Sequence, residues 1–297
     1  MTAKKAASRA RLAARPSEAQ KGSPPKRRSK PAGPARPASP PNAPILLLTG
    51  DGSIAVEFAQ AAASKGYLVH MWNTDPVPAQ SSLPERTKIV SNPTPNASVA
   101  LELTIVDKTS KQRNLKALDA ALPPSAPILS CSLTVAATEQ AAWVTGKHRL
   151  VGFAALPTYA GKTTAEAAPT VFTPRQTLDA AAAFFASLGQ RMELVQDRVG
   201  LVSARIVCQL INEAAFALQE DVATPEDIDT AMKLGVHYPH GPFAWAEVLG
   251  VRNVVAVLQA LQAEYQEERY RLAPLLKHMS LGGEWWHRQT ESTPKER

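Results

Sequence analysis

The feature that most constrains this chain is an apolar run, a glycine turn and a helix-like segment in direct succession. Residues 45–48 (Ile-Leu-Leu-Leu) have the pattern of a strand buried on both faces. Residues 49–53 form a turn, residues 54–65 have the apolar spacing of a helix that ends at Gly66, and residues 67–72 form a second apolar run. Two strands joined by a helix within about 30 residues make a βαβ unit, whose strands run parallel.

Strand-like and helix-like segments keep alternating up to residue 197. Further strands are expected at residues 100–106, 126–131 and 150–156, and helices at residues 110–121 and 178–188. From residue 200 the apolar spacing is helical only, with helices expected at residues 202–218, 225–235, 243–249, 253–268 and 272–279. The sequence therefore predicts a Rossmann-like α/β domain with a parallel sheet over residues 44–198, followed by an all-helical domain over residues 199–283.

Both ends of the chain differ from this body. Residues 1–43 are rich in Pro and Ala and hold 11 Lys or Arg against one acid, whereas the rest of the chain holds 22 basic and 25 acidic residues. With so few apolar side chains, this basic tail is expected to be disordered. Residues 284–297 are expected to form a C-terminal tail, in which Trp285 and Trp286 act as an apolar anchor.

The charge distribution limits the partners. Because the basic residues are concentrated in the tail, nucleic-acid binding by the folded body is disfavoured, while a polyanion remains a candidate partner for the tail. The tail lacks the apolar core of a secretory signal, but its Arg and Ser content also fits an organelle transit peptide. No stretch has the length and hydropathy of a transmembrane segment.

The cysteines and histidines exclude two further classes. Cys131 and Cys208 both lie in apolar sequence, which predicts buried reduced thiols and a cytoplasmic or matrix setting rather than a disulfide scaffold. The six histidines show no metal-ligand spacing, so the sequence predicts no metal site.

The turn between the first strand and helix has the spacing GxGxxA. Gly50 permits a tight turn, Gly52 permits close approach of a pyrophosphate, and Ala55 is small enough for helix and strand to pack. Asp51 adds a negative charge beside the expected anion, and Asn73 stands where an acid usually binds the ribose hydroxyls. Two interpretations are open: a dinucleotide site, or a turn that serves packing only.

With its two domains in this order, the chain resembles the 3-hydroxyacyl-CoA dehydrogenase family from about residue 45 to 280. The resemblance is strongest in the helical region, at residues 210–214 (LINEA), 222–229 (VATPEDID), 232–235 (MKLG), 238–243 (YPHGPF) and 269–276 (RYRLAPLL). It implies NAD-dependent oxidation of 3-hydroxyacyl-CoA to 3-oxoacyl-CoA in fatty-acid metabolism, with an acyl-CoA as partner. It also favours a homodimer through the helical domain.

The resemblance further implies a His base held by a Glu and assisted by a Ser and an Asn. Glu166 matches the Glu, but the His, Ser and Asn positions hold Ala154, Leu133 and Ala204. Lacking its His, Glu166 is expected to be a solvated or hydrogen-bonded carboxylate rather than a catalytic group.

Two more residues match family positions near the nicotinamide and its phosphates. They are Glu102 and Lys111, which read equally well as an ordinary strand-end acid and a helix-surface lysine. The sequence thus leads to two hypotheses. The first is a pseudoenzyme, a family member whose NAD binding and activity are weak or lost. The second is a non-catalytic dimeric scaffold whose basic tail binds a polyanion.

Overall fold

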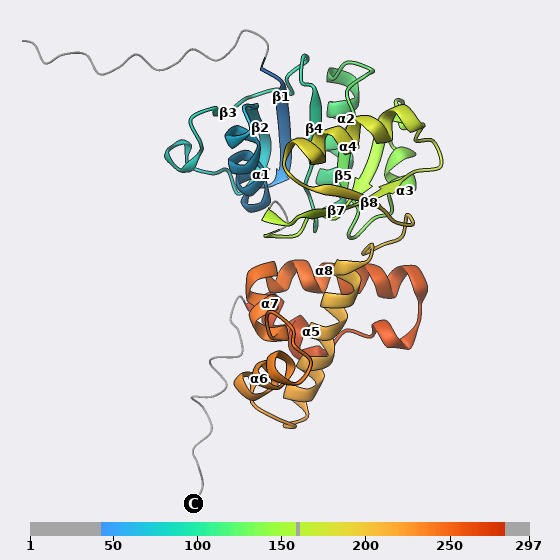
Figure 1. Ribbon diagram of the computed structural model, residues 1–297. Coiled ribbons are helices and arrows are strands. Elements are labelled where there is room, and N and C mark those ends of the chain that lie inside the picture. Colours follow the sequence, from blue (N-terminus) through green and yellow to red (C-terminus); the bar gives the residue numbers. More distant parts are fainter. Residues whose placement is uncertain (1–42, 159–160, 283–297) are drawn as a thin grey trace, which may run out of the picture. The chain divides into compact units, whose positions relative to one another are not determined.

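The computed structural model describes residues 43–158 and 161–282 (Figure 1). The expectations for residues 1–42 of the basic tail, and for the C-terminal tail with Trp285 and Trp286, lie outside these residues. Within them, no single helix is long and apolar enough to cross a membrane. Of the helices in these ranges, only the pair Pro242–Leu249 and Val251–Tyr265 passes by length and composition, and this pair is bent by 99°. Across the same ranges, no group of three or more His, Cys, Asp or Glu side chains could hold a metal ion.

Within the described residues, eight strands form one sheet in the order β3-β2-β1-β4-β5-β6-β7-β8. Their bounds are β1 Ile45–Asp51, β2 Leu68–Asp75, β3 Thr87–Ile89, β4 Val99–Glu102, β5 Ile128–Cys131, β6 Leu150–Phe153, β7 Thr164–Pro169 and β8 Arg191–Leu194. All neighbouring pairs run parallel except β6 and β7, which run antiparallel. The Rossmann-like α/β class is therefore confirmed, with one antiparallel pair that the sequence did not predict.

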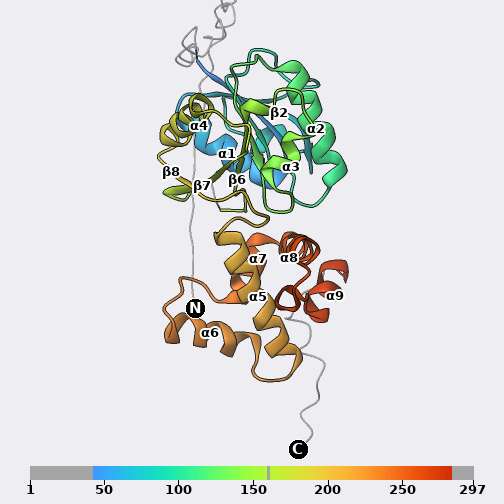
Figure 2. The ribbon, with the colours of Figure 1, turned by 90° about the vertical axis from the view of Figure 1, so that its right-hand side faces the viewer.

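Helices cover both faces of the sheet, as Figure 2 shows. Their bounds are α1 Gly52–Ser64, α2 Lys108–Ala121, α3 Ala137–Ala141 and α4 Arg175–Ser187. Alternation along β1 explains the two layers, since Leu46 and Leu48 pack in the cluster that holds α1 and α4, and Leu47 packs in the cluster that holds α2 and α3. The sheet is apolar on both faces because both are covered.

The helical part follows the sheet in sequence. Its helices are α5 Ser203–Gln219, α6 Pro225–Gly235, α7 Pro242–Leu249, α8 Val251–Tyr265 and α9 Pro274–Gly282. Thr224 caps α6 by accepting from the Asp227 N–H at 3.2 Å. Asp229 on α6 accepts from the N–H groups of Phe243 and Ala244 at 2.8 and 3.0 Å, so a side chain of one helix fixes the start of the next.

Candidate functional site

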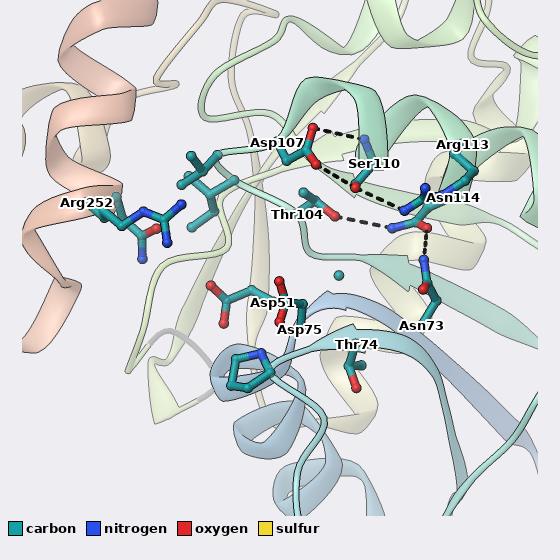
Figure 3. Close-up of a pocket in the computed structure, with 15 residues that line it drawn as sticks. Asp51, Asn73, Thr74, Asp75, Thr104, Asp107, Ser110, Arg113, Asn114 and Arg252 are labelled. Carbon is teal, nitrogen blue, oxygen red and sulfur yellow. Dashed lines mark hydrogen bonds between the residues drawn. The ribbon is translucent and has the colours of Figure 1, made fainter. Parts of the chain in front are cut away.

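The carboxyl ends of β1, β2 and β4 meet at a polar cavity of about 610 Å³ (Figure 3). This is the position where ligands bind in open α/β sheets, because the strand order reverses at β1. The turn after β1, the segment after β2, and the connection from β4 into α2 line the cavity, together with Arg252 on α8. The cavity brings together three residues that the sequence pattern predicted to lie at a dinucleotide site: Gly50, Asp51 and Asn73.

Gly50 and Gly52 are needed because the backbone is approached closely at both positions. Gly50 has a φ of +101°, and a Cβ there would lie 2.4 Å from the Thr104 nitrogen. A Cβ on Gly52 would lie 1.9 Å from the carbonyl oxygen of Pro76. Ala55 is completely buried in the core beneath the turn. The close approach at Gly52 is therefore made by the loop after β2.

Asp51 is the N-cap of α1. Its Oδ1 accepts from the backbone N–H groups of Ser53 at 3.0 Å and of Ile54 at 3.3 Å, and from the Ser53 hydroxyl at 2.6 Å. These N–H groups are among the free donors that a helix start offers to a phosphate. The sequence indicated the charge of Asp51 but not this hydrogen bonding, which depends on the side chain folding back over the turn.

Asn73 lies at the end of β2 with a φ of +47°. Its side-chain amide donates to the Asn114 carbonyl oxygen on α2 at 2.6 Å, and its backbone oxygen accepts from the Thr49 hydroxyl at 3.3 Å. Asn114 in turn donates to Thr104 at 3.3 Å. The proposed ribose ligand is thus tied to a partner that sequence reasoning missed.

Glu102 and Lys111 form an ion pair beneath the cavity, with both side chains at most 1% exposed. The interpretation of Lys111 as a helix-surface lysine is wrong, because its ammonium group points inward between β4 and β5. It also donates to the Cys131 carbonyl oxygen at 2.9 Å. Glu102 accepts further bonds from the Ser130 hydroxyl at 3.2 Å and the Thr104 N–H at 3.1 Å. Pairing and hydrogen bonding are what make two buried charges tolerable.

A second cavity, of about 370 Å³, collects the residues at the expected catalytic positions. Ala154, Glu166 and Ala204 all line it, whereas Leu133 is buried and is not among the lining residues. Sequence reasoning did not point to Trp245, Lys162 and several other lining residues: Leu156, Pro157, Thr158, Thr163, Thr164, Ser203, Val207 and Leu249. The cavity is lined by apolar side chains, by the carboxylate of Glu166, and by the polar side chains of Lys162, Ser203 and three threonines.

Glu166 binds the start of α5. Its carboxylate accepts from the N–H groups of Val202 and Ser203, each at 2.9 Å, and from the Ser203 hydroxyl. Helix α5 has no capping side chain of its own, so Glu166 takes this role from β7. Glu166 therefore satisfies backbone donors that would otherwise be free at the start of α5.

The two cysteines are buried. Burial raises the pKa of the Cys131 thiol, and it raises the pKa of the Cys208 thiol to about 12. Both thiols are therefore neutral at physiological pH, and neither has the character of a reactive nucleophile.

Comparison with known proteins shows the class of this architecture and the proteins that it is similar to. A sheet of this order with a glycine turn at its reversal point defines a Rossmann-type protein, here followed by a helical domain. Residues 200–292 match the model of the 3-hydroxyacyl-CoA dehydrogenase C-terminal domain.

Similar proteins cover more of the chain. A probable 3-hydroxybutyryl-CoA dehydrogenase of Bacillus subtilis is 26% identical over 258 residues, which are 78% of this chain and 90% of that protein. A 3-hydroxybutyryl-CoA dehydrogenase of Bradyrhizobium diazoefficiens is 29% identical over 66% of this chain and 67% of its own length. The crystal structure of (S)-3-hydroxybutyryl-CoA dehydrogenase from Ralstonia eutropha matches with a TM-score of 0.69 and 26% identity, over 82% of this chain and 95% of that one. The chain is thus similar over most of its length to proteins named 3-hydroxybutyryl-CoA dehydrogenase, and its helical part matches the C-terminal domain of the 3-hydroxyacyl-CoA dehydrogenases.

Proposed function

We propose that this chain is a family member whose NAD-dependent oxidation of 3-hydroxyacyl-CoA to 3-oxoacyl-CoA is weak or lost. The observation that carries this proposal is the second cavity, where Ala154 and Ala204 stand at the expected His and Asn positions. Oxidation of a 3-hydroxyl group needs a base for its proton, and an alanine supplies none. Glu166, the remaining group of the expected set, already accepts from the start of α5.

The cofactor and the acyl-CoA belong to the same proposal. NAD binding is weak or lost, since the end of β2 carries Asn73 instead of an acid for the ribose hydroxyls and its amide is bonded to Asn114, and an acyl-CoA remains the substrate class that the family implies. Cytoplasmic localisation fits the two buried, neutral thiols, with organelle targeting by the basic tail as the alternative.

The second candidate function is a non-catalytic dimeric scaffold whose basic tail binds a polyanion. It is supported by the 11 basic residues in residues 1–43, and by exposed apolar side chains on the helical part, such as Ile206 and Leu234. This function needs neither a base in the second cavity nor a cofactor in the first.

The test is turnover of acetoacetyl-CoA with NADH at neutral pH, with the Bacillus subtilis relative assayed beside it. We expect this chain to be slower by at least ~10²–10⁴, the usual contribution of general acid–base catalysis. Comparable rates for the two proteins would contradict the proposal.

A further inference from the structure

We infer that the anion site of the dinucleotide turn is filled by the chain's own Asp51 carboxylate, which competes with the pyrophosphate of NAD(H). The inference rests on the proposed function and gives a specific cause for weak cofactor binding. It differs from the loss of the catalytic side chains, because Asp51 lies at the first cavity and Ala154 at the second.

The hydrogen bonds of Asp51 are those that a bound phosphate would make. A single oxygen, Oδ1, accepts from two backbone N–H groups of the first turn of α1 and from the Ser53 hydroxyl. A carboxylate is the natural occupant of such a site, because the helix start favours negative charge. A pyrophosphate can take these donors only if the Asp51 side chain leaves them.

The space over the turn is also taken. Gly52, whose missing side chain should admit the pyrophosphate, has the Pro76 carbonyl oxygen 1.9 Å from the position that a Cβ would occupy. Asp51 and Asp75 are register partners on β1 and β2, so two carboxylates line the cavity at the same level. The turn therefore presents oxygen atoms to a ligand whose own oxygens are negatively charged.

The obstacle is local to the turn. Arg113 on α2 and Arg252 on α8 line the same cavity, and Figure 3 shows them on opposite sides of it. Cationic groups of this kind attract a phosphate rather than repel it. Removing the Asp51 carboxylate should therefore be enough to strengthen dinucleotide binding.

Asp107 offers a matched control. It caps α2 as Asp51 caps α1, accepting from the Thr109 and Ser110 N–H groups at 2.9 and 3.1 Å and from the Ser110 hydroxyl at 2.6 Å, and it lines the same cavity. These hydrogen bonds hold the pKa of Asp107 below its ordinary value, so its charge is present at neutral pH. Asp107→Ala removes one charge and one helix cap without freeing donors in the glycine turn.

The experiment is a titration of NADH into the full chain, followed by NADH fluorescence, for the wild type and for Asp51→Ala, Asp51→Gly and Asp107→Ala. Asp51→Gly is included because glycine is nearly as good an N-cap as aspartate and keeps the fold if alanine does not. Thermal melts of each variant establish that it is folded. We expect both Asp51 variants to bind NADH about tenfold tighter or better, the effect of roughly one charge-assisted hydrogen bond.

The outcomes separate this inference from the proposed function. Asp107→Ala removes a charge from the same cavity but frees no donor of α1, so its gain in NADH affinity should stay well below that of both Asp51 variants. Equal affinities of the wild type and both Asp51 variants would overturn the inference, and so would an equal gain in Asp107→Ala. Neither result touches the proposed function, which fails only on robust wild-type turnover of acetoacetyl-CoA.

Discussion

Lys111 and Lys108 lie one turn apart on α2 and form ion pairs in opposite surroundings. Lys111 pairs with Glu102 inside the protein, whereas Lys108 pairs with Glu139 at 2.6 Å with side chains 62% and 47% exposed. Removing one partner of a buried pair leaves an uncompensated charge in a medium that solvates it poorly. An exposed charge that loses its partner is solvated by water instead.

We therefore predict that Lys111→Met lowers the free energy of unfolding by about 3–5 kcal/mol, as found for broken buried pairs. Lys108→Met, the matched control, should cost less than about 1 kcal/mol. Urea unfolding of both variants measures the difference. Changing Glu102 to Gln in the Lys111→Met background should recover part of the loss, because no charge then stays unpaired. Similar losses in the two single variants would refute a structural role for the buried pair.

Single residues also mark where sequence reasoning stops. The GxGxxA spacing predicted that another group approaches the backbone closely at Gly50 and Gly52. It could not show that at Gly52 this group is the carbonyl oxygen of Pro76, 24 residues later in the chain. The burial of Lys111 was equally hidden, because its partners lie on β4 and β5 and lysines on helices are usually exposed. Contacts between elements set both outcomes, and local pattern does not encode them.

Among the secondary-structure elements, the junction between α2 and β6 depends on one charged pair. Asp119 near the end of α2 binds Arg149 at 2.7 Å, with side chains 11% and 5% exposed. Arg149 also donates to the Leu122 and Pro123 carbonyl oxygens at 3.2 and 2.8 Å. Burial alone would raise the pKa of Asp119, but hydrogen bonds from Arg149 and from the Thr145 and Gly146 N–H groups outweigh it and lower the pKa.

A carboxyl group whose pKa is lowered on folding contributes stability that is present above its unfolded pKa, about 3.9, and is lost as the pH falls through its folded pKa. We predict that the free energy of unfolding decreases below about pH 4, and that Asp119→Asn flattens this part of the profile. Asp179→Asn, which removes an exposed partner of Arg175, should leave it unchanged. Urea unfolding between neutral and acid pH provides the comparison, and identical profiles for wild type and Asp119→Asn would rule the linkage out.

The elements differ in how far the sequence predicted them. The helices α1, α4 and α6 and the strand β1 carry apolar runs or cap residues that stand out locally, such as Thr224 followed by Pro225. β7 and β8 do not stand out. Ala165, Ala167 and Ala168 of β7 are buried, but alanine has little preference for strands. Pairing with β6 and β8 determines this strand, and that pairing exists only once the sheet has formed.

For the whole molecule, the open question is what covers the apolar residues of the helical part. Helix α5 buries Cys208, Ile211 and Ala215 in the core, but Ile206 on the same helix stays 53% exposed. Leu234 at the end of α6 is 74% exposed. A surface helix needs one apolar stripe, so we propose that a second subunit covers the additional exposed side chains.

We predict a homodimer through this face that persists at high salt, because apolar burial is not screened as charge pairs are. Ile206→Glu should shift the protein toward monomer, since a carboxylate would be buried without a partner. Val171→Glu, at an exposed position between β7 and α4, is the control and should leave the dimer intact.

Deleting residues 1–43 should also leave the dimer intact, while it removes most of the affinity for a polyanion such as heparin. Sedimentation at low and high salt measures the oligomeric state of each variant, and a wild-type monomer at micromolar concentration would refute the dimer.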